Sequence, residues 1–355
     1  MPRSPRNQEL QKPPHLDRGD TIAVVSQSWG GPAMFPHIYD RGIANLKETF
    51  GLRVKEYPTT REKPAYLHEH PEKRADDINR ALADPEVKGI FSSIGGEDSV
   101  RVLPFIDAEA ALSNPKILLG YSDAHTVVSY LNSQGLVTYA GPSVMAGFSQ
   151  MEEFPDSFAR HIEDILFSGV GEHEYRPYPE YSERYPDWSK VESTGKTNPK
   201  KRNPGWKWLQ VGGAKARGRL FGGCMDVLEF LKGTRFWPQE PGFWDGKILF
   251  FESSEEKPSP DMVRYWLRNY GMQGVLGRIS GLLFGRPVLY SDDEKLNLEK
   301  SIVSVVKGEF GRGDIPVVLD MDFGHTDPQF IMPLGIQAEI DSDSKQLRIT
   351  EPTAG

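Results

Sequence analysis

The sequence predicts an α/β protein built on a doubly wound parallel sheet, with a second domain in the C-terminal half. Short apolar runs of the kind that fill buried parallel strands recur through the first half of the chain. Stretches with helical spacing separate these runs, and repeated β-α units form a parallel sheet with helices on both faces. The length of 355 residues allows two domains of ordinary size.

Five strands are expected in the first half of the chain, each followed by a helix. In the helix predicted over 71–83, the spacing of Ile78 and Leu82 turns both side chains inward. The expected strands are 20–26, 52–57, 87–94, 115–119 and 137–142, and the expected helices are 39–50, 71–83, 99–106, 127–131 and 154–167.

The composition changes near Gly169. Residues 171–210 are rich in Tyr, Pro, Glu, Lys and Trp with little periodicity, which predicts a domain crossing with an irregular loop. The second domain begins with 216–224, and its tail alternates like two antiparallel strands. The further strands expected are 246–252, 281–285, 315–319, 336–340 and 346–349, and the helices are 225–231, 260–270 and 293–309.

The composition argues against several classes of protein and of binding site. The net charge of -8 argues against nucleic acid as the main partner, because phosphate binding needs clustered Lys and Arg. The single cysteine, Cys224, excludes an internal disulfide and a multi-cysteine zinc site. No apolar run approaches the roughly 20 residues of a membrane span. Residues 1–17 lack the apolar core of a signal peptide, so we expect a loose tail and a cytoplasmic location.

Two loops follow strand ends and are candidates for lining a binding site, because ligands bind at the carboxyl ends of parallel strands. Residues 27–36 are rich in Gly and Pro but lack the Gly-x-Gly-x-x-Gly pattern, so a dinucleotide cofactor is not expected. Gly95 and Gly96 follow the third strand and let backbone amides approach a ligand closely. A plain tight turn is the alternative interpretation of these two glycines.

Ser122 stands where the fourth strand gives way to a helix. Three candidate groups directly follow apolar strands: Ser122, Glu252 and His325. They suit a nucleophile, a base that titrates near neutral pH, and a carboxylate that orients the base. The corner is not Gly-x-Ser-x-Gly, so Ser122 or Asp123 could be only a helix N-cap. Glu252 could likewise be a cap or surface ion-pair member, His325 a loop residue, and His125 is the rival base.

Five motifs together resemble the LD-carboxypeptidase family of serine peptidases. Each motif is weak alone, but their order over residues 19–340 is specific. The motifs are Ile94-Gly95-Gly96, Gly120-Tyr121-Ser122-Asp123, Phe221-Gly222-Gly223 with Leu231-Lys232-Gly233-Thr234, Leu249-Phe250-Phe251-Glu252, and Gly324-His325 followed by Pro333-Leu334-Gly335.

The resemblance implies a serine peptidase site without a metal. It implies that Ser122, Glu252 and His325 form the catalytic triad. It also implies that the oxyanion is held by the backbone amides of Gly96, or its neighbour, and of Asp123.

The resemblance further implies a division of the chain between two domains, commonly in a homodimer. A Rossmann-like N-terminal domain over 18–168 carries the nucleophile. Residues 169–215 form the crossing and a tryptophan-bearing loop. A smaller β-rich α/β domain over 216–355 carries the glutamate and the histidine.

Within the family, the sequence looks closer to the microcin C self-immunity branch, which cleaves an aminoacyl nucleotide, than to the murein branch. The murein branch more often has Arg-Gly-Gly-Tyr-Gly at the glycine corner, and this chain lacks that Arg and Tyr. Gly95 and Glu97 of the corner are expected to contact substrate. A tryptophan loop stacks on the nucleobase in the immunity branch. Trp206 and Trp208 are candidates here, with packing as the alternative, and 200–202 could meet a phosphate.

The function expected from the sequence is a serine carboxypeptidase or amidase that hydrolyses an amide bond in a small peptide or an aminoacyl nucleotide. Murein tetrapeptide cleavage during cell-wall recycling is the first alternative. A non-catalytic protein that binds a small ligand at the sheet edge is the second.

Overall fold

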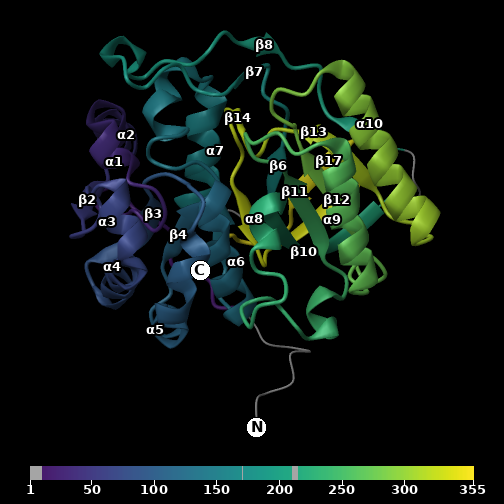
Figure 1. The fold of residues 1–355 in the computed structure, drawn as a ribbon, viewed down its shortest axis with the longest axis horizontal. Coiled ribbons are helices and arrows are strands. Elements are labelled where there is room, and N and C mark those ends of the chain that lie inside the picture. The colour runs from purple at the N-terminus through teal and green to yellow at the C-terminus, as the bar shows by residue number, and fades with distance from the viewer. Residues whose placement is uncertain (1–9, 170, 210–214) are drawn as a thin grey trace.

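The computed structural model describes residues 10–169, 171–209 and 215–355. Its elements gather around two sheets, with most of the N-terminal half on the left of Figure 1 and the C-terminal half on the right. Within these residues, the first sheet has six strands, the second has eight, and three short strands form a small third sheet. The predicted fold class, a doubly wound Rossmann-like part followed by a β-rich α/β part, is confirmed.

The first sheet has the strand order β15-β5-β4-β3-β1-β2. Strands β1 to β5 run parallel to one another, while β15, from near the C-terminus, pairs antiparallel with β5. The order reverses between β1 and β3, the kind of switch point beside which α/β sheets bind ligands. The strands are β1 (Thr21–Val25), β2 (Arg53–Glu56), β3 (Val87–Ser92), β4 (Ile117–Gly120), β5 (Thr138–Ala140) and β15 (Met332–Leu334).

The helices of the first half begin and end where local chemistry requires. In α4, Pro71 occupies the first turn, and the predicted inward side chains of Ile78 and Leu82 are buried. Helix α2 ends at Gly51, whose φ of 65° closes it in the left-handed conformation. The helices are α1 (Gly31–Met34), α2 (Pro36–Phe50), α3 (Pro64–Glu69), α4 (Pro71–Ala83), α5 (Ala108–Ser113), α6 (His125–Gln134) and α7 (Asp156–Leu166).

Several segments of the first half differ from the prediction. The short helices α1, α3 and α5 were not expected. The helix expected after β3 is a 3-10 helix, Ser99–Phe105, because Pro104 lacks the N–H that an α-helix would use there. Residues 10–17 are not a loose tail, because Leu16 is fully buried in the core. Residues 1–9 of the predicted tail lie outside the described residues.

The second sheet has the strand order β6-β17-β16-β10-β11-β12-β13-β9. Its centre, β10 to β13, is parallel, and antiparallel strands flank it on both sides. The predicted antiparallel pair in the tail is confirmed as β16 and β17. The strands are β10 (Lys215–Cys224), β11 (Ile248–Glu252), β12 (Gly281–Gly285), β13 (Val317–Met321), β16 (Gln337–Asp341) and β17 (Gln346–Ile349).

The segment expected to be irregular contains four short strands. Each strand has only two to four residues and is held by pairing with another part of the chain. Strands this short do not show a periodic pattern in the sequence. Residues 210–214 of the predicted crossing lie outside the described residues. The strands are β6 (His173–Tyr175), β7 (Glu180–Glu183), β8 (Lys201–Arg202) and β9 (Lys207–Leu209), and β14 (Thr326–Asp327) pairs with β7.

Three helices accompany the second sheet: α8 (Met225–Glu229), α9 (Pro260–Met272) and α10 (Asp292–Val303). Helix α10 begins at a capping box in which Ser291 and Glu294 bond to each other's backbone N–H, and it continues as a π-helical turn over Ser304–Glu309. No helix in the described part of the chain has the length and apolar character needed to cross a membrane.

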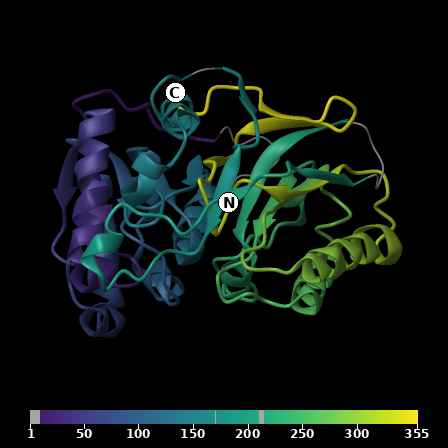
Figure 2. The same cartoon turned by 90° about the horizontal axis from the view of Figure 1, so that it is seen from above.

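The two halves face each other along the carboxyl ends of their parallel strands. Figure 2 shows the two groups of elements on either side of a central region, and α6 from the first half contacts β10 of the second. The loops after β1, β3 and β4 and those after β10, β11 and β13 all open into this region. The topology therefore brings residues far apart in sequence to one place.

Candidate active site

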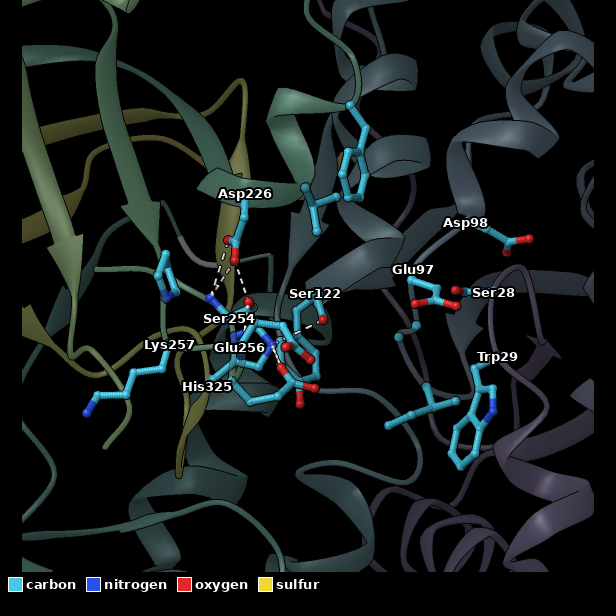
Figure 3. A pocket seen from close by; sticks show the side chains of 18 of the residues that line it. Ser28, Trp29, Glu97, Asp98, Ser122, Asp226, Ser254, Glu256, Lys257 and His325 are labelled. Atoms are coloured by element: carbon cyan, nitrogen blue, oxygen red, sulfur yellow. Dashed lines mark hydrogen bonds and ion pairs between the residues drawn. The ribbon is translucent and has the colours of Figure 1, made fainter. Parts of the chain in front are cut away.

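A cavity of about 1320 Å³ lies between the two halves. Both halves contribute charged and aromatic residues to its wall, and the first half adds Gly95 and Gly96. Figure 3 labels Trp29, Glu97 and Asp98 of the first half and Asp226, Glu256 and Lys257 of the second. The residues that matter below are Ser28, Trp29, Gly95, Gly96, Glu97, Asp98, Tyr121, Ser122, Arg184, Tyr185, Trp188, Asp226, Ser254, Glu255, Glu256 and His325.

Ser122 occupies a strained corner at the end of β4. Its φ is 57°, a left-handed conformation that costs a non-glycine residue free energy and is typical of strand-to-helix nucleophile corners. A short 3-10 turn, Ser122–Ala124, links the corner to α6. The conformation holds the hydroxyl at the cavity wall, although the residue is only 8% exposed.

The structure brings Ser122, His325 and Glu252 into one hydrogen-bonded chain, of which Figure 3 labels Ser122 and His325. The Oγ of Ser122 lies 3.1 Å from Nε2 of His325, and Nδ1 of His325 lies 2.7 Å from Oε2 of Glu252. Glu252 is the last residue of β11, and His325 stands between β13 and β14. Three elements from two sheets therefore assemble the order nucleophile, imidazole and carboxylate that serine hydrolases use.

The carboxylates around His325 decide its charge. Burial alone would lower the pKa of His325, but Glu252 and Glu255 together raise this pKa well above its usual value. Glu252 accepts the Nδ1–H and fixes the tautomer, so that Nε2 faces Ser122. The second carboxylate, Glu255, lies 2.8 Å from the same Nε2.

Within the described residues, His125, the rival base, forms no hydrogen bond with the hydroxyl of Ser122, although its ring lies near the Ser122 backbone. Its Nδ1 accepts the backbone N–H of Cys224 at 2.9 Å, and the ring packs against Gly223. Burial lowers the pKa of His125 to about 3, so the ring stays neutral. His125 therefore supports the end of β10 and leaves His325 as the imidazole beside the serine.

The backbone around the serine fits an oxyanion site. Within the described residues, the N–H groups of Gly96 and Asp123 have no hydrogen-bond partner. Gly95 leaves the space open, since a Cβ there would lie 2.8 Å from Cβ and 2.9 Å from Oγ of Ser122. Gly96 has a φ of 153°, which glycine adopts without strain.

The side chain of Asp123 ties three loops together beneath this corner. Its Oδ2 accepts the hydroxyl of Ser28 at 2.5 Å and the backbone N–H of Ser99 at 2.7 Å. Asp98 in the neighbouring loop is bound by the fully buried Arg74 at 2.7 Å. These contacts fix the ends of β1, β3 and β4 relative to one another, a role that the sequence pattern did not reveal.

A buried ion pair supports the turn that carries His325. Arg286 and Asp322 lie 2.9 Å apart, with side chains that are 2% and 0% exposed. The indole N–H of Trp206 donates to the same aspartate at 2.7 Å, and Trp206 packs against Trp208 and Phe330. Because they pack beneath this turn and do not line the cavity, the position of Trp206 and Trp208 favours packing, the alternative interpretation, over contact with substrate.

The remaining sequence expectations divide between the cavity and the surface. Gly95 and Glu97 line the cavity, with Glu97 exposed on the side opposite His325 (Figure 3). The basic run 200–202 does not line it, and Lys201 instead forms an ion pair with Glu183. A phosphate contact by this run is therefore not supported by its position.

Several cavity residues were missed by sequence reasoning. Trp29 belongs to the loop after β1 that was expected to line the site, but no pattern singled it out. Tyr185 and Trp188 come from the irregular segment, where their rings lie 4.9 Å apart. Glu255 lies three residues beyond Glu252, and its contact with His325 depends on a turn that only the structure reveals.

Cys224, Glu252 and His325 place potential ligand atoms within 4.8 Å of one another, the one such group within the described residues. These side chains already have hydrogen-bond partners in the protein, since His325 is bound to Glu252 and Cys224 to Asp226. The thiol donates to Asp226 at 2.9 Å, and burial raises the pKa of this thiol well above its usual value. We therefore assign no metal to this group.

Comparisons with known proteins agree with the geometry. Residues 22–141 match the model of the LD-carboxypeptidase N-terminal domain and residues 217–340 that of the C-terminal domain. A Vibrio cholerae protein named as a carboxypeptidase is 28% identical over 95% of this chain and 96% of its own. The microcin C7 self-immunity protein of Escherichia coli is 26% identical over 94% of each chain. A solved structure of a microcin C7 self-immunity protein with aspartyl sulfamoyl adenosine has a TM-score of 0.84 at 26% identity, covering 97% of this chain and 100% of that one.

Proposed function

The chain belongs to the LD-carboxypeptidase family, and from this premise we propose that it hydrolyses an amide bond in an aminoacyl nucleotide or small peptide through Ser122, His325 and Glu252. The observation that carries the proposal is the continuous hydrogen-bonded chain from the serine hydroxyl through the imidazole to the buried carboxylate. The family and its carboxypeptidase-named relatives make the protein a serine-peptidase-like hydrolase.

In the first step, the hydroxyl of Ser122 gives its proton to Nε2 of His325 while Oγ attacks the carbonyl carbon of the scissile amide. Glu252 accepts the Nδ1–H and stabilises the imidazolium that forms. The carbonyl oxygen becomes an oxyanion, which the N–H groups of Gly96 and Asp123 hold by hydrogen bonds.

Collapse of the tetrahedral intermediate breaks the carbon–nitrogen bond. His325 returns the proton to the leaving nitrogen, and the acyl group stays as an ester on Ser122. A water molecule then gives a proton to the imidazole and attacks the ester. The acid is released, and the serine regains its proton from His325.

The aromatic wall of the cavity supports a nucleoside in the leaving group. Trp29, Tyr185 and Trp188 present ring faces or edges to a space large enough for an aminoacyl nucleoside. Base stacking on such rings contributes about 1–3 kcal/mol per base. A relative's structure contains aspartyl sulfamoyl adenosine, a ligand of this chemical class. We assign the stacking role to Trp188 in place of the tryptophans that the sequence suggested.

A side-by-side hydrolysis assay tests the proposal. Wild-type protein and Ser122→Ala are incubated with an aminoacyl sulfamoyl adenosine and with a murein tetrapeptide ending in D-alanine, and products are identified by mass spectrometry. We expect wild-type cleavage of the nucleoside conjugate and no cleavage by Ser122→Ala. Cleavage of only the tetrapeptide would assign the protein to wall recycling. Binding of either compound without hydrolysis would favour the non-catalytic binder.

Two further expectations remain part of the proposal. A cytoplasmic location is supported by the single, buried thiol, which fits a reducing compartment. A homodimer is supported by the family resemblance, and light scattering at micromolar concentration would decide it. A monomer mass that does not change with concentration would contradict the dimer.

A further inference from the structure

Nε2 of His325 has two partners where the proposed reaction uses one. Ser122 Oγ lies 3.1 Å from this nitrogen, and Oε2 of Glu255 lies closer, at 2.8 Å. A carboxylate carries a negative charge and only acceptor atoms, so this ion-pair contact favours the form of the ring that has a proton on Nε2. With Nδ1–H already donated to Glu252, His325 in this arrangement is an imidazolium that cannot accept the serine proton.

We propose that Glu255 is a positioning residue that keeps His325 protonated and inactive in the empty enzyme, and that substrate entry displaces its carboxylate and frees the base. The inference rests on the proposed function, because it concerns the same imidazole. The contact point is also the position that the leaving nitrogen must reach to collect its proton. Glu255 and a productively bound substrate therefore compete for Nε2.

The local structure lets the Glu255 side chain move while its backbone stays in place. The side chain is 55% exposed, whereas that of Glu252 is 2% exposed and cannot leave. The preceding residue, Ser254, donates its backbone N–H to Asp226 at 3.3 Å, and Arg184 donates to the carbonyl oxygen of Glu255 at 3.4 Å. A rotation about side-chain bonds is sufficient to open the site.

The other titratable groups around His325 do not replace Glu255. From β14, the buried Asp327 has a pKa raised to about 6 by burial, and from α6 the neutral His125 carries no charge. Tyr121 from the corner after β4 places its ring 5.1 Å from the imidazole, and burial raises the pKa of its hydroxyl well above the usual value. Cys224 from β10 keeps its proton for the same reason.

The charge of Glu255 itself fits this role. Burial opposes ionisation, but the hydrogen bond and the charge of His325 lower the pKa of Glu255 to about 2. The proton in the contact therefore belongs to the imidazole until the pH rises above the raised pKa of His325. Removing the negative charge of Glu255 leaves Glu252, among the described residues, as the one carboxylate hydrogen-bonded to the ring.

The test compares Glu255→Gln with Glu256→Gln, a matched control that neutralises the next carboxylate of the same cavity wall. The rate of covalent labelling by a fluorophosphonate is measured from pH 5 to pH 9 without substrate. We expect the labelling midpoint of Glu255→Gln to fall by at least about one pH unit, with about tenfold faster labelling at pH 7. Glu256→Gln should follow the wild-type curve, and all three should converge at high pH.

Nitrogen NMR of histidine-labelled protein gives a second readout that does not depend on activity. In the empty wild type at pH 7, both nitrogens of His325 should carry protons, and Nε2 should lose its proton in Glu255→Gln. Identical curves and spectra for Glu255→Gln and Glu256→Gln would overturn the inference, as would slower labelling of Glu255→Gln. Failure of the proposed function has a different result: no labelling of wild type even at pH 9 and none of Glu255→Gln, or labelling that persists in Ser122→Ala.

Discussion

Replacing Gly95 with alanine probes the geometry between the glycine corner and the nucleophile. The added carbon would lie 2.8 Å from Cβ and 2.9 Å from Oγ of Ser122, whereas ordinary contacts begin at 3.4 Å. The serine must therefore retreat by more than half an ångström. The φ of Gly95 lies outside the left-handed region, so alanine adds no backbone strain there.

A displacement of this size at a reacting atom lowers the rate steeply, since about 1 Å of misplacement costs about 100-fold. We expect kcat/KM of Gly95→Ala to fall about 100-fold, equivalent to about 2.7 kcal/mol of transition-state stabilisation. Steady-state hydrolysis of the aminoacyl sulfamoyl adenosine measures this ratio, and urea unfolding measures stability in parallel. The free energy of unfolding should also fall, by about 1–3 kcal/mol, because Cβ of Ser122 can move only together with its backbone.

Gly171→Ala is the matched control, because a Cβ at Gly171 meets no atom within 4 Å and its backbone is not in the left-handed region. This variant should retain wild-type kinetics and stability. Wild-type kcat/KM in Gly95→Ala would refute the reasoning that the glycine corner shapes the reaction site. Equal losses in both glycine variants would show that the loss is unrelated to the corner.

Three further predictions address stability and recognition. Burial raises the pKa of Asp327 to about 6, so the folded protein keeps a proton that the unfolded chain loses above about pH 4. The free energy of unfolding, measured by urea titration, should therefore fall by up to about 3 kcal/mol from pH 4 to pH 6. Asp327→Asn should abolish this part of the fall, and an unchanged dependence of stability on pH in that variant would contradict the prediction. Arg286→Leu leaves Asp322 charged and buried without its cation and should cost about 3–5 kcal/mol in the same measurement, whereas a loss below 1 kcal/mol would contradict the pairing. Trp188→Ala should weaken adenosine monophosphate binding by about 1–3 kcal/mol in calorimetry, whereas Trp206→Phe should leave this binding unchanged. Weaker binding by Trp206→Phe together with unchanged binding by Trp188→Ala would assign the stacking role to Trp206 instead.

Much of the first sheet could be predicted because each parallel strand is a continuous apolar run that pattern analysis detects. Helix α4 was predicted with the same ends, Pro71–Ala83, since a proline and a periodic apolar face mark it locally. Short strands such as β8 (Lys201–Arg202) escaped, because two exposed residues carry no periodicity and their pairing partner, β7, supplies the order. Residues 10–17 were similarly misjudged, since their burial comes from distant contacts.

The serine, glutamate and histidine could be singled out because each lies at or shortly after the end of an apolar strand, and parallel sheets gather such positions at one edge. Their mutual distances could not be predicted, since they depend on how two sheets face each other. The same dependence applies to the tryptophans: Trp206 lies near a basic run in sequence, but its indole donates a hydrogen bond to the buried Asp322, which favours the packing alternative. Glu255 illustrates the opposite case, where a turn brings an unremarked carboxylate onto the imidazole.

The most direct test of the central claim is peptide mapping of the covalent adduct formed with a fluorophosphonate. We expect a single adduct on the peptide that contains Ser122, and fragmentation should assign it to this hydroxyl. Ser122→Ala should carry no adduct, and His325→Ala should label at least about 100-fold more slowly because the base is gone. An adduct on another residue, or wild-type labelling of folded His325→Ala, would contradict the assignment of nucleophile and base.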